Sequence, residues 1–178
     1  EAPYKMFFET TAPAAPARRL LTDSDFLSNK EALDMSWTEY KVLAGLPAMG
    51  MDVDLEKFFT VAELNSLWAC ENLGHYLRRT ATTLSTVPAL IASDLLLNLI
   101  TTTDAAVAGK NRFNVELRFG HAETLMPLLS LMRLRGCYYM TNYFDTVGLH
   151  WKDFDVVPMA ANLQMVLFRT DKGGWCVR

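Results

Sequence analysis

Cysteine is scarce in this chain of 178 residues, and the cysteines lack the spacing that is typical of metal ligands. The three cysteines, Cys70, Cys137 and Cys176, lie far apart, and no two have the spacing of metal ligands. Because their number is odd, at least one is unpaired within the chain. We interpret all three as small buried apolar side chains, which leaves the redox compartment open.

Long apolar runs and a strong net charge are also lacking. No segment approaches the uninterrupted length of about 20 apolar residues that a membrane span needs. The most apolar segment, 87–100, is interrupted by Ser93, Asp94 and Asn98, and it predicts a buried helix. The net charge of −3 and the pI near 5.6 argue against general binding to nucleic acids or anionic membranes, although a local cationic pocket remains compatible with them.

Motifs for phosphate loops, zinc and serine-type catalysis are missing as well, and the sequence predicts no cofactor and no metal. What is present is ordinary for a globular domain, with 51% apolar and 21% charged residues. The chain begins at Glu1 rather than Met, and 175–178 is typical of a strand cut short. We therefore expect a chain that has been shortened at both ends.

The first part of the chain divides into a predicted linker, 1–19, and a predicted helical lobe, 20–110. Three prolines, at positions 3, 13 and 16, predict loop over residues 1–17. Short helices are expected from Asp23 or Ser24 and over 36–44, followed by a break at 45–47.

The two clearest helices are expected later in this lobe. Thr60 and Glu63 have the capping-box spacing, in which each side chain satisfies a free backbone donor of the other, so a helix should begin here. Its apolar residues recur at helical spacing. A second long helix is expected from about Pro88 to about Ala108, with the proline in its first turn.

The last part, 111–178, predicts strands. Apolar residues alternate with polar ones over 113–119, which is typical of a strand, and Gly120 ends it. A helix is expected over 125–134. A second strand is predicted over 163–169, and 171–174 predicts a hairpin turn into a third. The predicted fold class is therefore α/β, with a mostly helical lobe plus two or three strands of a sheet.

One pair of residues is a candidate catalytic site: His121 and Glu123, at the point where the predicted strand ends at Gly120 and a helix begins. The first turn of a helix presents free N–H groups and a partial positive charge, which together favour phosphate. An imidazole there can donate hydrogen bonds to phosphoryl oxygens, and a nearby carboxyl group can protonate a leaving alkoxide. The structural alternative is that Glu123 only complements the helix dipole and that His121 is a turn residue.

The string Leu117–Met132, with its Gly120-His121-Ala122-Glu123 core, resembles the C-terminal active-site signature of multiple inositol polyphosphate phosphatases, the His-Ala-Glu branch of the histidine acid phosphatases. Residues 157–168 are similar to the family's following strand segment. The resemblance is specific over 113–134 and 157–169 and loose over the helical part. It implies the histidine phosphatase fold, a mixed sheet flanked by helices with a helical lobe inserted into it.

The resemblance also implies roles for single residues. His121 would bind phosphoryl oxygens, and Glu123 would protonate the departing inositol oxygen after a nucleophilic histidine attacks phosphorus. In the family that nucleophile lies in an Arg-His-Gly motif, and no such motif occurs in these 178 residues, where the other histidines are His75 and His150. We therefore expect the chain to be inactive alone, with the missing N-terminal half of the same enzyme as its partner. The uncovered sheet edge is expected to be unpaired or covered by another chain.

Other residues are weaker candidates. Arg79 could contact a polyphosphate or simply be solvated at a helix end, as could Arg78. Arg118 could reach the site, or it could pair with Glu116 or with a neighbouring strand. Aromatic residues at 138–151 should pack against the sheet, with stacking on a ligand ring as the alternative.

Two other functions remain open: hydrolysis of other small phosphate esters such as bisphosphoglycerate, and a non-catalytic helical interaction domain. The resemblance implies an exported protein, located in the periplasm or at the outer surface of a bacterium or in the secretory lumen of a eukaryote.

Overall fold

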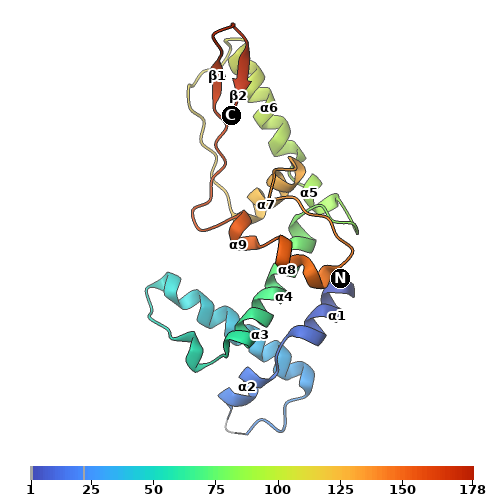
Figure 1. Cartoon of the computed structure of the whole chain (residues 1–178). Helices are drawn as coiled ribbons and strands as arrows, with labels where there is room; N and C mark the ends of the chain where they lie inside the picture. Colours follow the sequence, from blue (N-terminus) through green and yellow to red (C-terminus); the bar gives the residue numbers. More distant parts are fainter. Residues whose placement is uncertain (1, 22) are drawn as a thin grey trace. The chain divides into compact units, whose positions relative to one another are not determined.

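The computed structural model describes residues 2–21 and 23–178 and is mostly helical, with one two-stranded antiparallel sheet in the described part (Figure 1). This agrees with a helical lobe plus strands. The chain forms two compact units. The first comprises the residues up to Gly74 together with Phe144–Gly148, and the second comprises His75–Tyr143 and Leu149–Arg178.

The first unit opens with two helices, α1 (Ala2–Thr11) and α2 (Ala15–Leu20), so the prediction of loop over residues 1–17 is wrong for 2–11 and 15–17 and correct for 12–14. Glu1 lies outside the described residues. The prolines occupy positions that helices tolerate: Pro3 lies in the first turn of α1, Pro16 at the start of α2, and Pro13 between them. A first-turn residue has no intrahelical acceptor for its N–H, so proline loses nothing there.

Helix α3 (Asn29–Gly45) contains the short helix predicted over 36–44, whereas the helix predicted from Asp23 or Ser24 is wrong, because residues 23–28 are not helical. Ser28 is its N-cap and forms a full capping box with Glu31, whose carboxylate accepts from the Ser28 N–H at 2.9 Å. The predicted break at 45–47 is only partial, because α3 passes directly into the 3₁₀ helix η1 (Leu46–Met49). A second 3₁₀ turn, η2 (Leu55–Lys57), follows.

Apolar contacts and one buried hydrogen bond hold these helices together. The Phe8 and Trp37 rings meet edge to face, with their centroids 5.7 Å apart, beside a buried cluster of Ala12, Leu33 and Cys70. The buried Ala17 N–H donates to Ser36 Oγ at 3.0 Å. That bond satisfies a donor at the start of α2, where the helix supplies no acceptor of its own.

Helix α4 (Val61–Arg79) starts where its sequence predicts. The Thr60 N–H donates to the Glu63 carboxylate at 2.8 Å, and the Glu63 N–H donates to Thr60 Oγ1 at 3.3 Å, so the predicted capping box is confirmed. Glu63 also accepts two hydrogen bonds from the Arg19 guanidinium, at 2.8 and 2.7 Å. Arg19 and the capping hydrogen bonds lower the pKa of Glu63 from 4.5 to about 2.

This lowered pKa predicts a loss of stability in acid. A carboxylate whose folded-state pKa lies below its unfolded value contributes stability above about pH 4.5, and loses it as the pH falls toward 2. We expect Glu63→Gln to flatten this part of the profile of unfolding free energy against pH, measured by urea titration at a series of pH values. Glu56→Gln, at an exposed carboxylate, should keep the wild-type profile; equal flattening in both variants would contradict the assignment.

In the second unit, the helix predicted from Pro88 to Ala108 is divided into α5 (Val87–Leu90) and α6 (Ser93–Val107). The division arises because the Ala92 N–H bonds to Ala89 O, three residues back rather than four, which tightens the chain into a turn. Both helices contact α7 (Ala122–Leu131), the helix predicted over 125–134. The buried Ser130 Oγ of α7 accepts from the Ala81 N–H at 3.0 Å.

An aromatic cluster forms the core of the second unit. The Trp151 ring lies edge to face on Tyr76 of α4, with centroids 5.6 Å apart, and its Nε1 donates to Cys137 O at 3.3 Å. Burial raises the pKa of Tyr76 to about 12. The predicted packing role is therefore correct for Trp151, but the surface it covers is a helix rather than the sheet. Helix α9 (Asp153–Val156) follows in the second unit, whereas η3 (Phe144–Thr146) and the first half of α8 (Val147–His150) belong to the first unit.

The sheet is a hairpin of β1 (Leu167–Arg169) and β2 (Trp175–Val177), in which Phe168 is opposite Cys176. The predicted turn at 171–174 is confirmed, and the predicted strand at 163–169 is shorter than expected. The predicted strand at 113–119 is wrong for this structure: no ladder partner for it is present among the described residues, and Phe119 is 94% exposed. Alternating apolar and polar residues determine which side chains share a face of a strand. A segment forms a strand only when a neighbouring strand pairs with its backbone N–H and C=O groups.

Candidate functional site

The candidate site lies at the start of α7, where Gly120 precedes the helix. His121 is the N-cap residue, with an extended backbone (φ −117°, ψ 172°), and its carbonyl accepts from the Thr124 N–H at 2.9 Å. Its imidazole makes no capping hydrogen bond. A Cβ added at Gly120 would lie 3.4 Å from Thr124 Oγ1, so glycine lets the chain enter the helix close to its first turn.

Both predicted catalytic side chains are exposed at this helix start. Glu123 lies in the first turn of α7, and His121 immediately precedes the helix. The N–H groups of Ala122 and Glu123 make no hydrogen bond to any described residue. The site thus offers free backbone donors, an imidazole and a carboxyl group to solvent. Such a helix start is suited to binding a phosphate oxyanion.

Arg118 has its hydrogen-bond partners on α6 and at Glu116. Its guanidinium donates to Asn98 Oδ1 at 2.6 and 3.1 Å and to Thr102 Oγ1 at 3.2 Å, and it pairs with Glu116 at 2.8 Å. The pairing with Glu116 is one of the predicted alternatives. Asn98 and Thr102 were not foreseen; they are four residues apart on one face of α6, and no local pattern links that face to Arg118.

Arg79 is half-buried near the C-terminal end of α4, and its Nε has no hydrogen-bond partner among the described residues. The chain just beyond it is fixed to α7 at Ser130. At about 1.5 Å of rise per residue, Ser130 lies about 10 Å further along α7 than Glu123. The structure therefore fixes the chain after Arg79 to the C-terminal half of α7 rather than to the helix start at His121.

The two other histidines have different surroundings. His75 Nδ1 lies 2.8 Å from Asp153 Oδ2 of α9, and the His150 ring stacks on Tyr139, with centroids 4.9 Å apart. Neither follows an arginine in the sequence. Nothing in the sequence around His75 indicates Asp153 as a partner, because the two are separated by most of the second unit.

The cysteines only partly fit their predicted role. Cys70 is fully buried, and burial raises the pKa of its thiol to about 12, so the reactive thiolate is not formed at neutral pH. Cys137 is half-buried and Cys176 is exposed on β2, so the prediction of burial is wrong for Cys176. Across residues 2–21 and 23–178, no three His, Cys, Asp or Glu side chains lie close enough to hold a metal ion together.

The arrangement defines a class of site, a helix start with an imidazole and a carboxyl group beside free N–H donors, rather than a protein family. No family model matches this chain. In the described part of the chain, none of the helices is both long and apolar enough to cross a bilayer.

Proposed function

We propose that this chain forms part of a phosphomonoesterase that acts on inositol polyphosphates through a phosphohistidine intermediate. The observation that carries the proposal is the start of α7, where His121, Glu123 and two free N–H groups are presented together. A phosphoryl group bound there would meet hydrogen-bond donors and the positive end of the helix dipole. The resemblance of Leu117–Met132 to the His-Ala-Glu phosphatases supplies the reaction.

The proposed reaction has two steps. A histidine supplied by a polypeptide that carries an Arg-His-Gly motif attacks phosphorus, the bond to the inositol oxygen breaks, and Glu123 gives that oxygen its proton. Water then attacks the phosphohistidine while the Glu123 carboxylate accepts the water's proton, which releases phosphate and restores both residues. His121 holds the phosphoryl oxygens in both steps.

Phosphate release from inositol hexakisphosphate tests this proposal. The chain is assayed alone, together with a polypeptide that carries the Arg-His-Gly segment, and with the same polypeptide in which that histidine is replaced by alanine. We expect release only in the mixture with the intact motif, because no histidine of this chain follows an arginine.

Either of two results would contradict the proposal. Release by the chain alone would move the nucleophile to His75 or His150. If the mixture is inactive although both polypeptides are folded by circular dichroism, hydrolysis of inositol hexakisphosphate is excluded, and inactivity on other phosphate esters as well would favour a helical interaction domain. A panel containing bisphosphoglycerate distinguishes inositol polyphosphates from other phosphate esters as the substrate class.

A further inference from the structure

A groove in the first unit lies between α2, α3 and the segment before α4, far along the chain from the proposed phosphatase residues. Its volume is about 310 Å³, near the lower end of the sizes of small-molecule sites. Apolar side chains form most of its wall, with one threonine and one glutamate. The lining residues are Leu20, Met35, Thr38, Glu39, Val42, Leu43 and Phe58.

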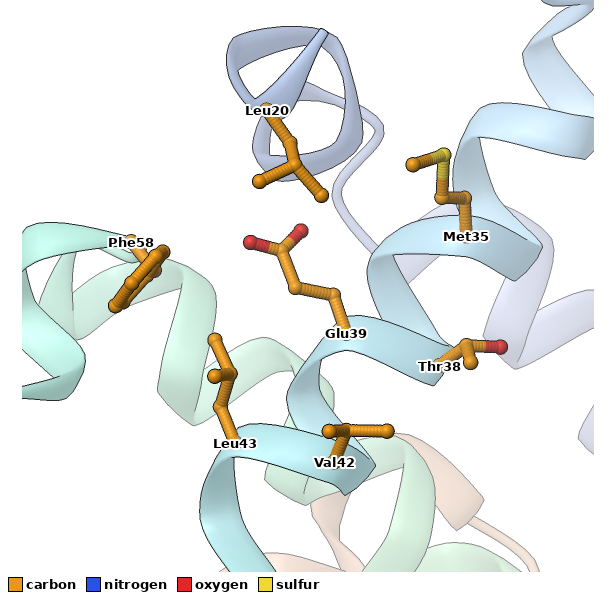
Figure 2. Close-up of a pocket in the computed structure, with 7 residues that line it drawn as sticks. All are labelled: Leu20, Met35, Thr38, Glu39, Val42, Leu43 and Phe58. Carbon is orange, nitrogen blue, oxygen red and sulfur yellow. The ribbon is translucent and has the colours of Figure 1, made fainter. Parts of the chain in front are cut away.

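Glu39 is the one charged side chain among these lining residues. Figure 2 shows its carboxylate directed into the space between Leu20 and Phe58. Its Oε2 atom is buried and has no hydrogen-bond partner among the described residues. Burial raises the pKa of Glu39 above its ordinary value. A buried acceptor without a donor is costly, so a donor that entered the groove would be stabilised there.

Glu39 shares its nearest cation, Arg19, with Glu63. Arg19 and Glu63 are the charged groups that act on it. Arg19 donates to both Glu63 oxygens and, at 2.8 Å, to Phe58 O. Because the pKa of Glu63 is about 2, that pair is already neutral overall near pH 7, with one positive and one negative charge. Among these three side chains, Glu39 therefore contributes the one negative charge that is in excess.

We propose that this groove binds a small organic monocation with an apolar body, a primary alkylammonium being the simplest form. The ammonium group pairs with the Glu39 carboxylate, whose buried Oε2 turns toward the groove to accept it, and the alkyl chain lies against Leu20, Leu43 and Phe58. The apolar wall favours the apolar body of the ligand, and the Glu39 carboxylate selects its positive charge. A carboxylate or phosphate ligand would instead face a second negative charge in a largely apolar site. The proposal is independent of the phosphatase site.

The test is a titration of the whole chain with n-hexylammonium, followed by ¹H–¹⁵N chemical shifts, with n-hexanol as the neutral probe of equal length. We expect hexylammonium to shift the amides of α3 and to bind about tenfold or more tightly than hexanol, as a charge-assisted hydrogen bond would give. In Glu39→Gln, which keeps the size of the side chain, that preference should disappear. Affinity for hexylammonium should fall as the pH is lowered and Glu39 takes up a proton.

Glu9→Gln, at an exposed carboxylate of α1, is the matched control and should bind hexylammonium as the wild type does. Three results would overturn the proposal: no amide shifts around the groove, equal affinity for hexanol and hexylammonium, or unchanged preference in Glu39→Gln. An equal loss in Glu9→Gln would also overturn it, because the attraction would then come from the overall charge rather than from the groove.

Discussion

Replacing Glu123 by glutamine is expected to lower phosphate release from inositol hexakisphosphate about 10²- to 10⁴-fold when the chain is combined with the Arg-His-Gly polypeptide. This is the usual size of a general acid–base contribution, and glutamine cannot give the inositol oxygen a proton. Glu123 is exposed on the first turn of α7 and makes no hydrogen bond that an amide would break, so the fold should survive the change. The measurement is the initial rate of phosphate release at matched protein concentration.

An activated ester separates proton donation from a structural effect. The leaving group of p-nitrophenyl phosphate departs without a proton, so Glu123→Gln should slow formation of the phosphohistidine much less with this substrate. Glu56→Gln, an exposed carboxylate on η2, should leave both rates unchanged. The comparison is made on the first step alone, by single-turnover measurement of phosphohistidine formation, because the second step is common to both substrates. If Glu123→Gln slowed that first step equally with both substrates, its role as proton donor would be ruled out.

Replacing Trp151 by alanine should destabilise the second unit by about 3–5 kcal/mol, the usual cost of removing a buried tryptophan. Trp151 is only 1% exposed, contacts the Tyr76 ring and donates a hydrogen bond to Cys137 O. The alanine variant loses that packing and leaves the carbonyl without this donor. Urea unfolding followed by far-ultraviolet circular dichroism measures the change.

Trp175 provides the matched control for this substitution. It is 44% exposed on β2, so Trp175→Ala should cost far less than Trp151→Ala. Loss of the near-ultraviolet signal of a packed aromatic cluster should accompany the Trp151 change alone. Equal destabilisation by the two substitutions would mean that the Tyr76–Trp151 contact does not hold the unit together.

Local signals in the sequence predicted the elements whose hydrogen bonds are local. The capping box of Thr60 and Glu63, the turn at 171–174 and the start of a helix after His121 each depend on residues within a few positions of one another. The same logic is wrong for 2–11 and 15–17, where the prolines predict loop. Pro3 and Pro16 lie in the first turns of helices, where proline is tolerated.

The segment 113–119 failed for a different reason. Its alternation of apolar and polar residues is typical of a strand, but a strand exists only when another segment satisfies its N–H and C=O groups. Which segment could do that is not encoded near residue 113. The division of the helix predicted over 88–108 into α5 and α6 likewise follows from a single turn at Ala92, which the apolar pattern does not reveal.

By itself, the sequence determined where α4 and the hairpin turn begin, and it placed His121 beside Glu123 at a helix start, because these features depend on neighbours along the chain. Only the tertiary structure decided which residues from distant parts of the chain contact one another. It bound Arg118 to Asn98 and Thr102, paired Arg19 with Glu63, and left Glu39 as the excess charge in an apolar groove. Burial and charge pairing are properties of residues brought together from distant positions, so no local pattern can specify them.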